Sequence, residues 1–139
     1  MLRQHREDLR KRELAEALAV ETRLKQEALR LARLRQHQAD EFRTRQQAGP
    51  LDMRAIIDCR AFIGLLDRRI LEGLQDVAKA EHATAGHRQN LVQAMKDRKA
   101  IEVLQQRAMN REQLAQARRE TAELDDISTR RFFLVAGRT

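Results

Sequence analysis

The stretch Ala48-Gly49-Pro50-Leu51-Asp52 is the place where this sequence interrupts a helix. Glycine permits the left-handed turn that often ends a helix, and proline cannot continue the helix before it. Asp52 can accept hydrogen bonds from the first amides of a following helix, so either Asp52 or a residue just before Pro50 would cap that helix. The stretch predicts a turn over residues 48–52, between a first helix of about residues 2–47 and a second of about 52–133. A C-terminal tail of residues 134–139 follows.

The composition on both sides of this turn is typical of long helices. The 139 residues include five glycines, one proline, no tryptophan or tyrosine and 3% aromatic residues, while 35% are charged. Ala, Leu, Arg, Glu and Gln dominate, and these residues lose little side-chain freedom in a helix. A compact domain needs more turn formers and more bulky core side chains. We therefore expect an extended all-α chain.

The second predicted helix carries a heptad seam, in which apolar and small residues recur at alternating steps of three and four. The seam positions are Ile56, Cys59, Ile63, Leu66, Ile70, Gly73, Val77, Ala80, Thr84, His87, Leu91 and Ala94. In the same register Arg98, Gln105 and Glu112 follow, so the apolar seam fades after about residue 95.

The first predicted helix carries a poorer seam. Its positions are Leu14, Ala17, Glu21, Leu24, Ala28, Leu31, Arg35, Gln38 and Phe42. Leu2 and Leu9 follow a different phase, which predicts a seam with stutters. A five-residue connection makes the two long helices antiparallel neighbours. The fold class we predict is a single coiled-coil domain, residues 1–139, in which an antiparallel hairpin leaves about thirty residues of the second helix overhanging the first.

The charge and hydropathy of the chain limit its partners and its location. The net charge is +7, and the excess lies in residues 1–47 and 95–139. No run of eighteen apolar residues and no leader-like segment occurs, so we expect a cytoplasmic protein without direct membrane insertion. Cys59 is the one cysteine, which fits a reducing compartment. Single-stranded nucleic acids are usually bound by basic residues interleaved with aromatic ones, a pattern that this chain lacks.

Candidate catalytic and metal sites find little support in the sequence. His82 and His87 lie five residues apart, about 140° round a helix, and no cysteine or carboxylate completes a metal cluster. Asp125 and Asp126 are adjacent and diverge on a helix, and no glycine-rich phosphate loop occurs. We expect no enzyme, no cofactor and no metal, with His87 packed in the seam.

Two of the four phenylalanines stand close to the predicted turn. The hairpin brings Phe42 and Phe62 near each other, with Phe62 beside the seam rather than in it. Together with Leu66, Phe62 forms a step along one side of the second helix. An exposed aromatic pair would serve as a partner anchor, whereas a buried pair would cap the coiled-coil core. The sequence leaves both interpretations open.

Several segments, in their order and in their spacing about the Gly-Pro break, resemble the FliJ family of flagellar export proteins, which is related to the YscO-type proteins of virulence secretion. The segments are residues 38–43 (QADEFR), 59–67 (CRAFIGLLD), 96–104 (KDRKAIEVL) and 120–128 (ETAELDDIS). The resemblance implies a non-enzymatic coiled coil, similar to the central stalk of rotary ATPases, that acts in flagellum biogenesis, motility and chemotaxis.

The resemblance also implies partners and contact residues. The partners are the hexameric flagellar export ATPase, the cytoplasmic domain of the export gate, at the cytoplasmic face of the inner membrane, and empty export chaperones. The implied contact positions are Gln38, Phe42, Phe62 and Leu66. Arg69 and Gly73, further along that face, depart from the family pattern.

The basic residues of the C-terminal segment would steer it toward an acidic ring lumen, which predicts salt-sensitive binding. These residues are Arg118, Arg119, Arg130 and Arg131. The alternatives are a structural coiled-coil dimer without a motor partner and a basic nucleic-acid-binding helical protein.

Overall fold

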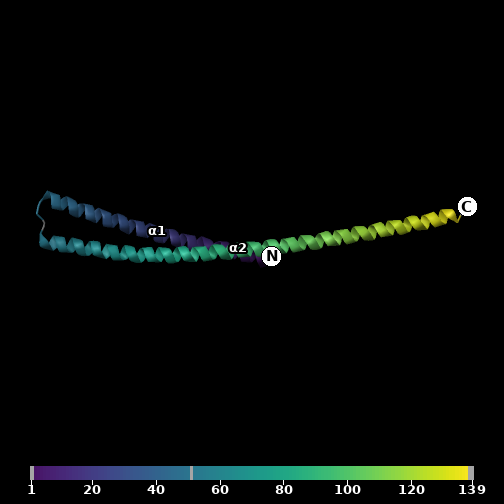
Figure 1. Ribbon diagram of the computed structural model, residues 1–139, viewed down its shortest axis with the longest axis horizontal. Helices are drawn as coiled ribbons and strands as arrows, with labels where there is room; N and C mark the ends of the chain where they lie inside the picture. The colour runs from purple at the N-terminus through teal and green to yellow at the C-terminus, as the bar shows by residue number, and fades with distance from the viewer. Residues whose placement is uncertain (1, 51, 138–139) are drawn as a thin grey trace. The chain divides into compact units, whose positions relative to one another are not determined.

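The computed structural model describes residues 2–50 and 52–137, and these residues form two helices and no strand. Helix α1 spans Leu2–Ala48 and helix α2 spans Met53–Ala136 (Figure 1). The all-α prediction is confirmed. The predicted end of the second helix was too early, because residues 134–136 of the expected tail are still helical. Residues 138 and 139 of that tail lie outside the described residues.

The connection between α1 and α2 differs in one respect from the predicted turn. Gly49 has φ 159°, so it does not adopt the left-handed helical conformation that the sequence suggested. Glycine tolerates this positive φ because it has no Cβ. The backbone carbonyl of Asp52 accepts a hydrogen bond from the amide of Ile56 at 3.1 Å. Asp52 therefore occupies the N-cap position of α2, as predicted. Leu51 lies outside the described residues.

The chain divides into two compact units, residues 1–94 and 95–139. In the first unit, α1 and the beginning of α2 lie side by side in opposite directions (Figure 1). Arg35 pairs with Asp67 at 2.8 Å, and Lys25 pairs with Glu81 at 3.3 Å. The α2 residue of each pair has a higher number where the α1 residue has a lower one, as an antiparallel hairpin requires. That part of the fold prediction is confirmed, while the single domain stays a prediction.

The predicted seam of α2 forms the inner face of the hairpin. All twelve of its positions are buried or half-buried, and Gly64 is the only other residue between 53 and 94 that is not exposed. Leu66 is the most deeply buried, at 2% exposure, and Val77, Ala80 and Thr84 are also buried. The heptad pattern therefore located this core correctly.

The seam of α1 is more regular than the sequence suggested. Its nine predicted positions are buried or half-buried, and the same register continues without a stutter to Arg10 and Glu7. Leu2 and Leu9 are 78% and 51% exposed, so the predicted change of phase is wrong. In a continuous helix the heptad repeat alone determines which residues face inward, so Glu7 and Arg10 lie on the inner face although they are polar. Buried Glu7 is accompanied by Lys11, whose Nζ lies 3.5 Å from the Glu7 carboxylate.

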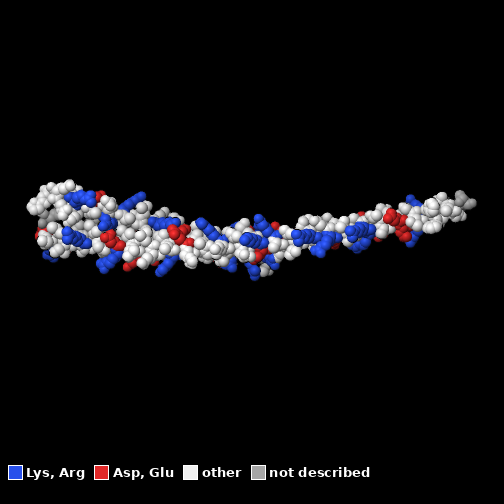
Figure 2. Space-filling view, viewed as in Figure 1, with Lys and Arg blue, Asp and Glu red and all other residues white. Residues whose placement is uncertain are grey.

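The second unit contains the remainder of α2. Every described residue from 102 to 137 is exposed, whereas Arg98 and Ile101 are still half-buried, so the seam continues slightly beyond the predicted fading at about residue 95. Figure 2 shows Lys and Arg along most of the drawn face, with Asp and Glu between many of them. Towards the C-terminus the last turns of α2 are mostly uncharged (Figure 2).

Candidate interaction surfaces

The residues near the turn form the first candidate surface. Gln38 and Phe42 are half-buried seam residues of α1, and Phe62 of α2 is 39% exposed. Gln38 and Phe42 also line a small hollow of about 30 Å³, which is completed by Glu41, Arg45, Ala55 and Cys59. The structure therefore brings the predicted α1 contacts into one hollow and leaves the aromatic ring of Phe62 accessible.

Leu66 does not belong to the accessible part of this surface. Its exposure of 2% contradicts the expectation of an exposed contact. Leu66 is a seam position, and the helix turns its side chain toward α1, whereas Phe62 lies just outside the seam. Phe42 and Phe62 do not form a ring pair, since among the described residues only Phe132 and Phe133 do so. Phe42 is consequently part core and part surface.

Ion pairs line one flank of the hairpin. Lys25 Nζ lies 3.3 Å from Glu81 of α2 and 3.5 Å from Glu21 of its own helix. The hydrogen bond to Glu81, aided by the charge of Glu21, raises the pKa of Lys25 above its ordinary value. Lys25 and Glu81 are both about half-exposed, and such pairs contribute little to stability. Their main effect is to fix the register of the two helices.

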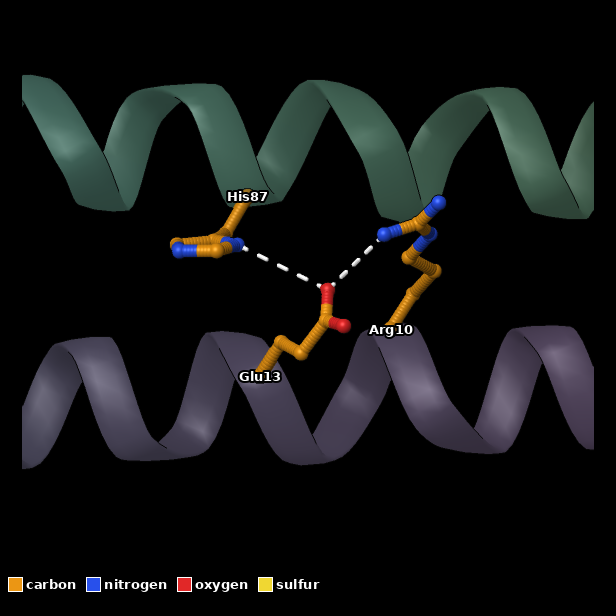
Figure 3. Close-up of polar contacts among 3 residues, drawn as sticks. All are labelled: Arg10, Glu13 and His87. Carbon is orange, nitrogen blue, oxygen red and sulfur yellow. Dashed lines mark hydrogen bonds and ion pairs between the residues drawn. The ribbon is translucent and has the colours of Figure 1, made fainter.

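A polar cluster joins the two helices further from the turn (Figure 3). Arg10 donates a hydrogen bond to Glu13 at 2.9 Å, and the same carboxylate oxygen lies 3.8 Å from Nδ1 of His87. That nitrogen is buried and has no hydrogen-bond partner among the residues that the structure describes. His87 is half-buried in the seam, as predicted. The cluster therefore aims a carboxylate from α1 at an imidazole from α2.

An open groove lies next to this cluster, with a volume of about 280 Å³. It is lined by Glu13, Glu16, Ala17, Val20, Ala80, Ala83 and His87. Alanines at facing positions leave the space between the helices unfilled. This groove was not predicted from the sequence, and the signal that could have indicated it is the placement of Ala17 opposite Ala80 and Ala83 across the hairpin.

The end of α2 forms a second candidate surface. The four predicted arginines, Arg118, Arg119, Arg130 and Arg131, are all exposed. Arg130 pairs with Asp126 at 3.3 Å, while Arg118 and Arg131 make no ion pair with the described residues. Four apolar residues, Phe132, Phe133, Leu134 and Val135, follow directly and are 66–70% exposed. Consecutive residues point in different directions on a helix, so this cluster is apolar all round.

The described residues contain neither a metal cluster nor a membrane-spanning segment. No group of three His, Cys, Asp or Glu side chains within residues 2–50 and 52–137 could hold a metal ion. Over the same residues, neither helix has a stretch that is long and apolar enough to cross a membrane.

Comparison with known proteins gives one match. A family model described as flagellar FliJ protein matches residues 1–136 of the chain. No curated protein and no solved structure matches it.

Proposed function

The chain belongs to the FliJ family of flagellar proteins, and we propose that it is the stalk-like subunit of the flagellar type III export apparatus. In this role it binds the export ATPase ring, contacts the cytoplasmic domain of the export gate and escorts export chaperones. The observation that carries the proposal is the family match over residues 1–136, on a chain that folds as a helical hairpin. The proposal assigns ATP hydrolysis to the ring, and assigns no reaction to this chain.

A physical reason supports a stalk role for a paired helix. A stiff, asymmetric element inside a ring of six similar subunits contacts only some of them at a time, so its binding energy favours different states around the ring. The continuous seam from residue 7 to residue 42 of α1 supplies stiffness to the first unit. Differential contact of this kind would couple the stalk to the catalytic cycle of the ring.

We assign the ATPase contact to the C-terminal part of α2. Its residues from 102 to 136 are exposed, and a single helix with charges all round is marginal in water unless something packs on it. Arg118, Arg119, Arg130 and Arg131 would steer this segment toward an acidic lumen. The apolar cluster that follows them would then supply buried contact area.

The test is binding to the purified export ATPase at several salt concentrations. Replacing the four arginines by alanine should weaken binding about tenfold or more and flatten its salt dependence. A matched control replaces four other arginines that make no ion pair with the described residues, namely Arg12, Arg23, Arg33 and Arg54. Equal losses in both variants would show a non-specific charge effect and remove the assignment.

We assign the gate contact to the surface near the turn. Phe62 is its accessible anchor, Gln38 and Phe42 form its α1 side, and Leu66 supports Phe62 from the core. An aromatic side chain on a rigid helix is a common source of binding energy at protein interfaces.

Phe62 has a matched control on the same helix, since Leu65 is also 39% exposed. Phe62→Ala should weaken binding to the gate domain by about tenfold, with helicity nearly unchanged and the melting temperature lowered by only about as much as in Leu65→Ala. Leu65→Ala should leave gate binding intact. A loss of binding in both variants, or in neither, would contradict the proposed anchor. A mass measurement in solution tests the alternative of a structural dimer, which would be twice as heavy.

Docking on these partners would place the protein at the cytoplasmic face of the inner membrane. Co-sedimentation with membranes that carry the gate, compared with membranes that lack it, tests this location. A pull-down with empty and substrate-loaded export chaperones tests the escort role, and only the empty form is expected to bind.

A further inference from the structure

A second apolar stripe follows the outer side of α2 in the first unit. It consists of Ile57, Gly64, Leu71, Ala78, Ala85 and Val92, spaced seven residues apart. Ile57, Leu71 and Val92 are 59%, 59% and 49% exposed, so α1 does not cover them. We propose that this stripe, here called the outer stripe, binds an acidic amphipathic helix as a third strand beside the hairpin. The inference goes beyond the proposed function, because it concerns a different face and does not depend on the export role.

The spacing of the outer stripe favours a helix over other partners. Residues seven apart form a nearly straight line on a helix, and a second helix in a coiled coil packs along such a line. The stripe runs for about 50 Å at 1.5 Å per residue. Two further exposed apolar residues, Met53 and Leu74, widen the stripe. They lie three or four residues from Ile57 and Leu71, which is the spacing of a second seam. The same column becomes polar at Lys99.

Gly64 provides an independent observation. A glycine inside a helix costs about 1 kcal/mol relative to alanine, so its presence there needs a reason. Gly73 faces α1, where a Cβ would lie in ordinary contact with the Cβ of Ala28, at 3.9 Å. A Cβ at Gly64 would meet nothing within 4 Å. The open backbone at Gly64 therefore forms a hole in the outer stripe that a side chain of a partner helix can enter.

The charges beside the outer stripe determine the kind of helix it accepts. Arg60, Arg68 and Arg88 flank the stripe and form no ion pair with the residues that the structure describes. The neighbouring carboxylates, Asp67 and Glu81, are engaged with Arg35 and Lys25 of α1. Asp58 and Glu72 directly follow Ile57 and Leu71, but they lie about 100° round the helix from the outer stripe, so the free charges nearest the stripe are basic. A helix with acidic residues beside its apolar face complements them.

A second copy of the chain fits the outer stripe poorly. Pairing two outer stripes would bring the arginines of one copy toward those of the other, and like charges at an interface oppose association. The charge pattern therefore favours a different, acidic partner over self-association.

The direct test uses a synthetic helical peptide of four heptads. It carries Leu and Ile at two positions of each heptad and Glu at the flanking positions, with a fluorescent label for anisotropy. The control peptide has the same apolar positions and Lys in place of Glu. The full chain should bind the acidic peptide at least about tenfold more tightly than the basic one. Equal affinities, or no binding of the acidic peptide, would overturn the proposal.

Substitutions in the protein locate the peptide. Ile57→Gln, Leu71→Gln and Val92→Gln together should weaken binding of the acidic peptide about tenfold or more, since all three side chains are exposed and the hairpin does not need them. The matched control substitutes exposed apolar residues of α1 in the same way: Leu9→Gln, Val20→Gln and Leu29→Gln. If the control lost as much affinity as the outer-stripe variant, the peptide would be bound elsewhere and the proposal would fail.

Gly64 offers a test in which stability and binding move in opposite directions. Gly64→Gln should raise the melting temperature, because glutamine is the better helix former, and should weaken peptide binding by filling the hole. Gly86→Gln is the control, because a Cβ at Gly86 also meets nothing within 4 Å but Gly86 lies off the outer stripe. It should raise the melting temperature and leave binding unchanged. Unchanged binding in Gly64→Gln would overturn the placement. A doubled solution mass that the outer-stripe variant abolishes would assign the stripe to a second copy instead.

Discussion

Leu66→Ala measures how much the hairpin depends on its thin core. Leu66 is the largest fully buried side chain, with 2% exposure. Leu→Ala substitutions in protein cores cost about 2–5 kcal/mol, and a two-helix core can partly collapse around the gap, so we expect about 2–3 kcal/mol here. For a unit of this size each kcal/mol lowers the melting temperature by about 4–8 °C. The expected fall is therefore about 10–20 °C, measured by calorimetry and by circular dichroism.

The adjacent residue gives this experiment its control. Leu65→Ala makes the same chemical change on the same helix, but Leu65 is 39% exposed and lies outside the seam. We expect it to cost about 1 kcal/mol or less, because less apolar surface returns to water. If the two variants melted within about 2 °C of each other, Leu66 would not be a core residue and the assignment of the α2 seam would be wrong.

Three further predictions concern the register, the close contact and the second unit. Gly73→Ala should stabilise the hairpin by about 0.5–1 kcal/mol, because alanine is the better helix former and its Cβ would lie in ordinary contact with Ala28; a lower melting temperature would mean that the helices are closer than described. Glu81→Gln should lower the melting temperature slightly at pH 8, where Lys25 is charged. The folded-state pKa of Lys25 is raised, so its contribution is complete below about pH 10 and is lost as pH rises through that pKa. The difference in melting temperature between Glu81→Gln and the native chain should therefore shrink above about pH 10. A difference that stayed constant up to about pH 11.5 would contradict a contribution from the Lys25–Glu81 pair. Truncation after residue 101 should leave the melting of the hairpin within about 2 °C, because every described residue from 102 to 137 is exposed.

Most of the hairpin core could be predicted from the sequence because a heptad seam is a local, repeated signal. Ile63, Leu66 and Ile70 fix the phase in α2, and every later seam position follows from the step of the helix. The prediction was wrong at the beginning of α1. Leu2 and Leu9 suggested a change of seam phase, but Glu7 and Arg10 occupy the inner face there. A continuous helix keeps the register that its apolar layers nearer the turn establish. Glu7 and Arg10 therefore lie on the inner face although their side chains are polar.

The candidate surfaces were harder to predict, since they depend on which side chains the partner helix leaves uncovered. Leu66 was expected to be exposed because the family resemblance suggested it, although its seam position already indicated burial. The groove beside His87 depends on alanines that meet only across the hairpin, a relation that neither helix contains by itself. The outer stripe was present in the sequence but could be recognised only after the inner seam had been assigned.

The seam combines two kinds of layer, and this division bears on how the hairpin can work. Leu31 and Leu66 supply buried apolar contact in the half nearer the turn. Further from the turn, buried Thr84 bonds back to the carbonyl of Ala80 at 2.9 Å, and His87 meets Glu13 at a separation of 3.8 Å. Such layers add little apolar burial, but a polar seam residue disfavours other registers. The buried apolar residues of α2 thus extend from Leu66 to Val77 and Ala80, and the polar layers beyond them keep the helices in register. The anchor proposed for the gate, Phe62, lies one helical turn before Leu66, the most deeply buried residue of α2, so the core would hold it as a fixed surface for its partner.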